Sequence, residues 1–220
     1  MTLVPDKTLM AELSDGHIKM GDLKKRAKGI KVDHELALEF WASGRFYPRM
    51  LAVLILDKKQ LTQASIEVLV ADMTGHPDKE RDYLSEWLLA NQLMKDRKLT
   101  ALIPTWAEHA SPVLRRLFWY HQARLRWTGQ KPPGNSAELM TSLESGLERE
   151  EPVVQWTMNF CAAQIGIREP EYRSRCIKLG ESLGLYKGER ARKNCTPNYL
   201  PEFIRIEVGK LEGVVRRTSA

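Results

Sequence analysis

Helical periodicity is the feature that most constrains the fold of this 220-residue chain. Apolar residues recur at spacings of three and four along almost every segment, and no stretch of four or more residues alternates as a strand would. We therefore predict an all-α fold of about eleven helices. They are expected over residues 7–28, 33–43, 46–58, 62–73, 78–95, 97–109, 112–128, 137–147, 152–166, 170–185 and 199–216.

Capping residues indicate where these helices begin and end. Asp33 stands at the start of the helix expected over residues 33–43, where its side chain can cap the helix. Pro112 and Pro152 occupy the first positions of two other helices, where the N–H that proline lacks would have no helical partner. Asn135 and Glu138 have the spacing of a capping box. Glycines stand where helices are expected to end, at Gly44, Gly75, Gly129 and Gly166.

The helix pairs recur at about 30–40 residues. Segment 41–49, with a tryptophan, a break and a Pro-Arg pair, is echoed by segment 106–116, and a third unit opens at Pro152. Such pairs form an α-solenoid when each covers its neighbour's apolar face. We therefore predict an α-α superhelix, with an irregular helical bundle as the alternative.

The longest break in the helical pattern, residues 129–136, fits either an interdomain linker or a loop between helix pairs. The same kind of pattern continues on both sides, which favours the loop. We therefore predict a single domain over residues 1–220, with disorder in the first few residues and in the C-terminal tail.

No membrane span, metal site or cofactor site is expected. The longest apolar run has seven residues, 50–56, whereas a membrane-spanning helix needs about 20. The five histidines lack metal-ligand spacing, and no glycine-rich phosphate loop is present. Cys161, Cys176 and Cys195 lie far apart, which is typical of reduced thiols and predicts a cytoplasmic protein.

Positive charge predicts a polyanionic partner, because the net charge is +6 and the pI is near 9.2. Spaced along the concave face of a solenoid, the basic clusters would follow a phosphate backbone, and binding to duplex DNA would weaken with salt. Taken singly, each cluster is typical of a solvated helix face. The clusters are residues 24–28, Arg45 with Arg49, Arg115 with Arg116, Arg124 with Arg126, and residues 187–193.

Four residues form a candidate site. Trp87 and Asn91 are four residues apart, so they share one helix face. Arg116 and Trp156 each lie four residues after a proline that opens a helix, and they reach similar heights if those two helices stack side by side. A half-buried core tryptophan beside a polar residue is the simpler interpretation of Trp87 and Asn91.

The order of these residues resembles the DNA alkylation repair (AlkD-like) family of HEAT-like repeat proteins, over roughly residues 20–210. Members carry a Trp-x-x-x-Asp motif, then an arginine in a Trp…Arg-Arg-apolar block, then a tryptophan in an inner helix of the next repeat. The matching residues of this chain are Trp87, Asn91, Trp106, Arg115, Arg116 and Trp156.

The resemblance implies a monofunctional DNA glycosylase that releases positively charged alkylated bases, such as N3-methyladenine and N7-methylguanine, from duplex DNA. Trp87 and Trp156 would pack against the deoxyribose. Arg116, with its neighbour Arg115, would hold a backbone phosphate. The family's aspartate stabilises the cationic sugar and helps to position the attacking water. We expect a monomer that needs neither metal nor cofactor.

Asn91 stands in the position of that aspartate. A neutral amide can orient a water molecule, but it cannot supply the negative charge that stabilises a developing cation. Neither Asp82 nor Asp96 has the spacing that would bring it onto the face of Asn91. The sequence therefore supports DNA binding more strongly than catalysis.

Three functions are compatible with these observations. The first is a glycosylase with weak activity, and the second is a non-catalytic protein that binds distorted or branched DNA. The third is a HEAT-type scaffold whose inner face binds an acidic protein. A phosphate-holding arginine between two tryptophans argues against the third, because protein scaffolds do not require that set.

Overall fold

The computed structural model describes residues 7–14, 18–129, 134–191 and 195–218 of the chain. All regular secondary structure in these ranges is helical, so the all-α prediction is confirmed. The expected disorder at both termini, residues 130–133 of the loop at 129–136 and part of the basic cluster at 187–193 concern residues outside these ranges. The α-helices are α1 (Lys7–Ser14), α2 (Met20–Ile30), α3 (His34–Ala42), α4 (Phe46–Ile55), α5 (Gln63–Met73), α6 (Asp78–Asn91), α7 (Arg97–Thr100), α8 (Pro112–Trp127), α9 (Ser136–Gly146), α10 (Pro152–Arg168), α11 (Pro170–Leu183) and α12 (Leu200–Thr218). The 3-10 segments are η1 (Lys58–Gln60), η2 (Leu93–Lys95) and η3 (Ile103–Trp106).

Most predicted helices are confirmed to within a few residues at each end, and three are divided. The helix predicted over 78–95 is α6 followed by the 3-10 segment η2. The helix predicted over 7–28 is two helices, α1 and α2, on either side of residues 15–17. The helix predicted over 97–109 is divided into α7 and η3. Pro104 lies in η3 and has no N–H with which to continue the α-helical ladder.

Several predicted caps are confirmed. Asp33 Oδ1 accepts a hydrogen bond from the Leu36 backbone N–H at 3.1 Å, which satisfies one of the free donors at the start of α3. Helices α8 and α10 begin at Pro112 and Pro152. After their helices end, Gly44 and Gly129 have φ of 69° and 73°, a left-handed conformation that glycine adopts without strain.

The predicted capping box at Asn135 and the predicted helix end at Gly166 are wrong. Asn135 precedes α9 but makes no capping bond, because its side chain turns to Gln122 and Arg126 instead. Gly166 does not end a helix but lies inside α10, where its missing side chain allows a neighbouring helix to pack closely. Packing against distant elements therefore decides both positions.

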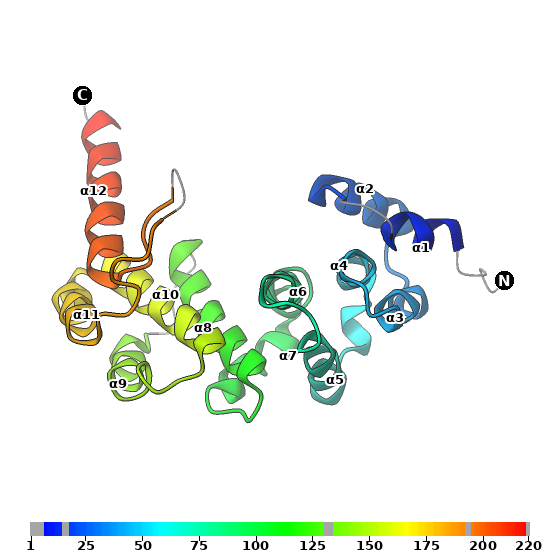
Figure 1. The fold of residues 1–220 in the computed structure, drawn as a ribbon, viewed down its shortest axis with the longest axis horizontal. Coiled ribbons are helices and arrows are strands. Elements are labelled where there is room, and N and C mark those ends of the chain that lie inside the picture. The colour runs from blue at the N-terminus through cyan, green and yellow to red at the C-terminus, as the bar shows by residue number, and fades with distance from the viewer. Residues whose placement is uncertain (1–6, 15–17, 130–133, 192–194, 219–220) are drawn as a thin grey trace. The chain divides into compact units, whose positions relative to one another are not determined.

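The chain divides into two compact units, Met1–Leu117 and Phe118–Ala220, and the division falls inside α8. Figure 1 shows the helices of the first unit in blue to green and those of the second in green to red. Each unit has its own central helix. A single domain over residues 1–220 stays a prediction.

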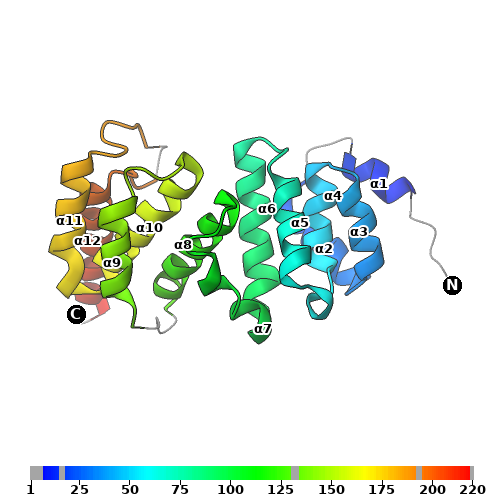
Figure 2. The same cartoon turned by 90° about the horizontal axis from the view of Figure 1, so that it is seen from below.

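The first unit is centred on α4, against which α2, α3 and α6 pack (Figure 2). Helix α4 is almost entirely apolar and buried. Two buried tryptophans fix its neighbours: the indole N–H of Trp41 donates to Asp72 at 2.8 Å, and that of Trp106 donates to Gln63 at 2.9 Å. Both acceptors are on α5, so the tryptophans that mark the predicted repeat are core residues of this unit.

The second unit is centred on α10, against which α9, α11 and α12 pack. Two glycines allow the close approach of α12. A Cβ added to Gly166 would lie 2.7 Å from Ile204 Cδ1, and one added to Gly180 would lie 2.6 Å from Pro201 Cδ. Because both distances are shorter than van der Waals contact, no larger residue fits without moving α12.

Gly180→Ala is expected to lower the free energy of unfolding by about 1–3 kcal/mol, because the added methyl group overpacks the contact with α12. The matched control is Gly209→Ala on α12, where an added Cβ would meet no described atom within 4 Å. That change is expected to raise stability by about 0.5–1 kcal/mol, since alanine favours helix more than glycine does. Urea unfolding measures both variants, and an equal response of the two would contradict the close packing.

Candidate nucleic-acid interface

Trp87 and Asn91 lie one turn apart at the C-terminal end of α6, and both are half-buried. Asn91 Nδ2 donates a hydrogen bond to the backbone carbonyl of Trp87 at 3.0 Å. The next residue, Gln92, is buried, and its Nε2 donates to the carbonyl oxygen of Val53 on α4 at 2.6 Å. The Gln92 bond fixes the end of α6 against the core of the first unit.

The amide of Asn91 suits this position better than a carboxylate would. An ionised aspartate cannot donate to the Trp87 carbonyl. Its charge would also face the carbonyl end of α6, where the helix dipole disfavours anions. Asparagine is therefore the locally stable choice, and an aspartate at this position would need nearby cations to compensate it.

Asn91 lines a pocket of about 300 Å³ in the first unit. The pocket is lined by four lysines whose side chains are exposed, and no acidic side chain in the described part of the chain lines it. Like charges converging on one hollow produce a positive potential that attracts anions. The lining residues are Lys24, Ala27, Lys28, Lys31, Val32, Leu54, Asn91 and Lys95.

Two of these lysines are held at the pocket by specific features. Lys24 Nζ lies 5.4 Å from the centroid of the Trp87 ring, within the range of a cation–π interaction, so it links that ring to the pocket. Lys31 ends α2 with φ of 68°, a backbone conformation that costs a non-glycine residue about 1–3 kcal/mol. The fold therefore keeps a lysine where glycine would be less strained.

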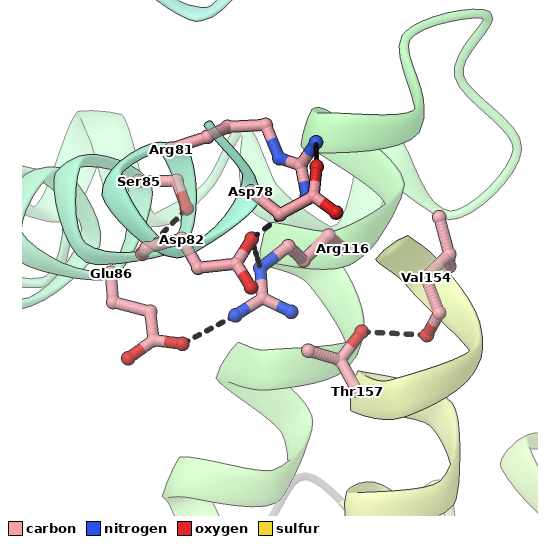
Figure 3. A network of polar contacts seen from close by, with 8 residues as sticks. All are labelled: Asp78, Arg81, Asp82, Ser85, Glu86, Arg116, Val154 and Thr157. Carbon is pink, nitrogen blue, oxygen red and sulfur yellow. Dashed lines mark hydrogen bonds and ion pairs between the residues drawn. The ribbon is translucent and has the colours of Figure 1, made fainter. Parts of the chain in front are cut away.

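Arg116 is 2% exposed, and carboxylates of α6 hold its guanidinium (Figure 3). Its Nη2 lies 2.5 Å from Glu86 Oε1, and its Nε lies 3.4 Å from Asp82 Oδ1. An arginine paired with two carboxylates adds little positive potential toward a phosphate. In this structure Arg116 ties the start of α8 to α6, and its binding to phosphate stays a prediction.

Arg115 is engaged with backbone carbonyls. Its Nη1 donates to the carbonyl oxygens of His109 at 2.7 Å and Ala110 at 3.1 Å, in the loop before α8. It therefore holds that loop closed. A contact between Arg115 and a phosphate also stays a prediction.

Trp156 belongs to the second unit, where it is half-buried among aromatic rings. Its ring stacks on Phe160 with 5.5 Å between centroids and 15° between planes, and it lies 6.5 Å from the ring of Tyr120. The structure thus brings Trp87 and Asn91 together in the first unit and places Trp156 in an aromatic cluster of the second. The convergence of all four predicted residues stays a prediction.

Besides Arg116, two further arginines of the predicted basic clusters are buried. Arg49 donates to the carbonyl oxygens of Trp41 at 3.0 Å and Asp72 at 2.8 Å, and Arg126 Nε lies 2.6 Å from Glu169 Oε1. The prediction that they follow a phosphate backbone is wrong, because protein groups occupy their guanidinium donors. The desolvated position of Arg49 also lowers its pKa.

The structure adds Lys31 and Lys95 to the candidate interface. Sequence reasoning grouped the lysines of residues 24–28 but overlooked these two. A signal was available, because Lys31 is three residues after Lys28 and Lys95 is four residues after Asn91. Both spacings bring side chains to one side of a helix or its continuation.

Buried titratable groups of the second unit are poorly suited to catalysis. Burial raises the pKa of the Cys161 thiol and of the Cys176 thiol to about 12, so both are protonated at neutral pH. Burial also lowers the pKa of His121 to about 4, so that side chain is neutral.

In the ranges that the structure covers, no helix is long and apolar enough to cross a membrane, and no three His, Cys, Asp or Glu side chains form a metal cluster.

Comparison with known proteins identifies the family. Residues 17–182 match the family described as DNA alkylation repair enzyme, so the chain belongs to that family. A solved structure matches with a TM-score of 0.70 and 16% identity, over 94% of this chain and 95% of that one. It is described as representing "a new family of proteins related to the HEAT-like repeat DNA glycosylases with affinity for branched DNA structures". No curated protein matches the chain significantly.

These matches agree with the family resemblance and the fold inferred from the sequence. The motifs around Trp87, Arg116 and Trp156 lie inside the matched residues. The structural match confirms the HEAT-like repeat fold, since its coverage is nearly complete on both chains.

Proposed function

We propose that this protein binds the phosphate backbone of DNA at the Asn91 pocket and does not release alkylated bases. The observation that carries the proposal is the composition of that pocket, in which four lysines surround a neutral amide. Lysine ammonium groups bind phosphates, and their contacts supply most of the affinity of proteins that hold DNA without reading its sequence.

The same composition argues against glycosylase chemistry. Release of a base leaves positive charge on the sugar, and a catalytic site lowers that barrier with a fixed negative charge. The Asn91 amide has no net charge, and its Nδ2 is engaged with the Trp87 carbonyl. The surrounding lysines would raise the energy of a developing cation and would repel a cationic alkylated base.

Family membership supports DNA as the polyanion. The structurally similar protein has affinity for branched DNA, according to its description. We infer that this chain has the same type of ligand, so that duplex and branched DNA bind in a salt-dependent manner. A cytoplasmic monomer that acts without metal or cofactor is part of the same proposal.

Release of N7-methylguanine from methylated duplex DNA tests the catalytic half of the proposal. The natural protein is expected to release none above the rate without protein, because the pocket lacks a carboxylate. Asn91→Asp restores the family residue and is expected to give measurable release, since its carboxylate supplies the fixed negative charge that the natural pocket lacks. Asn91→Ala is the matched control and is expected to remain inactive.

Electrophoretic mobility shifts at increasing salt test the binding half with the same proteins. The natural protein is expected to bind duplex and branched DNA, with an affinity that falls several-fold or more between about 50 and 200 mM salt. Absence of binding at low salt would remove the proposal. Release by the natural protein that survives Trp87→Ala would show that catalysis occurs elsewhere in the molecule.

A further inference from the structure

The second unit contains a pocket of about 340 Å³ that none of the predicted site residues lines. Aromatic residues from three helices form its walls: Trp127 at the end of α8, Phe160 on α10 and Phe203 on α12. Trp127 is 47% exposed, although a large apolar ring is normally covered. This opening is called the Trp127 pocket below.

The rings of the Trp127 pocket form one cluster. The centroid of the Phe160 ring lies 6.0 Å from that of Trp127 and 6.2 Å from that of Phe203, and both pairs are edge-to-face. Phe160 also stacks on Trp156 at 5.5 Å, so its ring is braced from the unit's interior. The walls are therefore pre-formed, and a planar guest would lose little binding energy to their rearrangement.

A buried polar atom in the pocket points to a guest with a hydrogen-bond donor. Gln164 lines the pocket and is 4% exposed, yet its Oε1 has no hydrogen-bond partner among the residues that the structure describes. Buried carbonyl oxygens of this kind are nearly always paired. An apolar guest would leave this oxygen unpaired, whereas the N–H groups of a nucleobase would pair with it once the Gln164 side chain turns toward the opening.

Positive charge lies at the rim. Arg168 is exposed and lines the pocket, and Arg124 Cζ lies 5.9 Å from the centroid of the Trp127 ring. Lys210 also lines the pocket, but its Nζ is bonded to Glu207 at 2.6 Å, so its charge is largely compensated. Arg168 can therefore hold the phosphate of a nucleotide whose base is inside the pocket.

We propose that the Trp127 pocket binds an unpaired nucleobase of DNA, extruded where the duplex is interrupted at a branch point or bulge. The proposal rests on the proposed DNA-binding function and assigns a second contact to it. Aromatic walls stack on any base, the Gln164 oxygen accepts from a base N–H, and Arg168 faces the phosphate. An unpaired base already lacks its partner, so its extrusion costs less than opening a base pair.

A three-way DNA junction with 2-aminopurine at an unpaired branch position tests the proposal. This base is fluorescent, and stacking on aromatic rings quenches it. The natural protein is expected to quench the unpaired base and to leave 2-aminopurine in a fully paired duplex unchanged. Trp127→Ala is expected to abolish the quenching and to weaken junction binding about ten-fold, with duplex affinity unaffected. Tyr83→Ala, which removes another exposed aromatic ring, is the control and is expected to change neither.

Gln164→Met separates a ligand contact from a structural one. The exchange keeps the size of the side chain and removes the unpaired oxygen, so we expect a higher Tm and weaker junction binding. Opposite changes in stability and affinity would not arise from damage to the fold. Unchanged junction affinity would overturn the hydrogen bond to the base.

The remaining outcomes are also decisive. Equal loss of junction and duplex affinity in Trp127→Ala would overturn the base pocket while leaving DNA binding in place. Absence of any DNA binding by the natural protein would instead remove the proposed function itself. Sedimentation that reveals a dimer dependent on Trp127 would assign the pocket to a second copy of the chain and overturn the proposal.

Discussion

Replacing Lys28 and Lys95 together by glutamine is expected to weaken duplex-DNA binding about ten-fold at about 100 mM salt. Each lysine that neutralises a phosphate contributes about 0.9 to the slope of log affinity against log salt, so the slope is expected to fall by about 2. Fluorescence anisotropy with a labelled duplex at several salt concentrations measures both quantities.

The matched control is the pair Lys59→Gln and Lys79→Gln. Both lysines are exposed, belong to the first unit and do not line the Asn91 pocket. The control removes the same charge, so it corrects for the general effect of net charge. If both double variants lose affinity equally, the Asn91 pocket has no special role in binding.

Arg126→Met is expected to lower the free energy of unfolding by about 3–5 kcal/mol, the largest stability effect predicted for a single change. The Arg126 side chain is fully buried and is paired with Glu169 at 2.6 Å. Its other nitrogens donate to the Gln122 carbonyl at 3.0 Å and to Ser136 Oγ at 2.6 Å. Methionine fills the same space but leaves the Glu169 carboxylate without its cation. Thermal and urea unfolding measure the loss.

Two controls separate the buried pair from salt bridges in general. The double variant Arg126→Met with Glu169→Gln removes both charges and is expected to recover part of the loss. Arg175→Gln breaks the pair between Arg175 and Glu144, whose side chains are 41% and 38% exposed, and is expected to lower the free energy of unfolding far less than Arg126→Met does. A similar cost for Arg126→Met and Arg175→Gln would contradict the importance of burial.

The sequence was sufficient to predict the fold because its signals are local. Helical periodicity, the proline starts at Pro112 and Pro152 and the cap at Asp33 depend on residues within one turn of each other. The ordered motif around Trp87 and Arg116 was sufficient to indicate the family. The pairing of Trp87 with Asn91 also follows from their spacing on one helix.

Burial of arginine was not predictable in this way. The carboxylates that hold Arg116 and Arg126 lie 30 and 43 residues away along the chain, at Glu86 and Glu169. A buried and an exposed arginine have the same local pattern when their partners are distant. The Trp127 pocket also could not be predicted from the sequence, because α8, α10 and α12 contribute its walls from separate parts of the chain.

The lysines around Asn91 also determine how the protein would search a genome. Phosphates repeat at every nucleotide and are chemically the same along the whole duplex, so contacts to them carry no sequence information. A protein held by such contacts meets nearly the same energy at each successive position, and it can slide and hop along the double helix with low barriers. The DNA binding proposed for the Asn91 pocket would therefore favour rapid scanning over residence at any one sequence, and a pause would require a local change in the shape of the DNA.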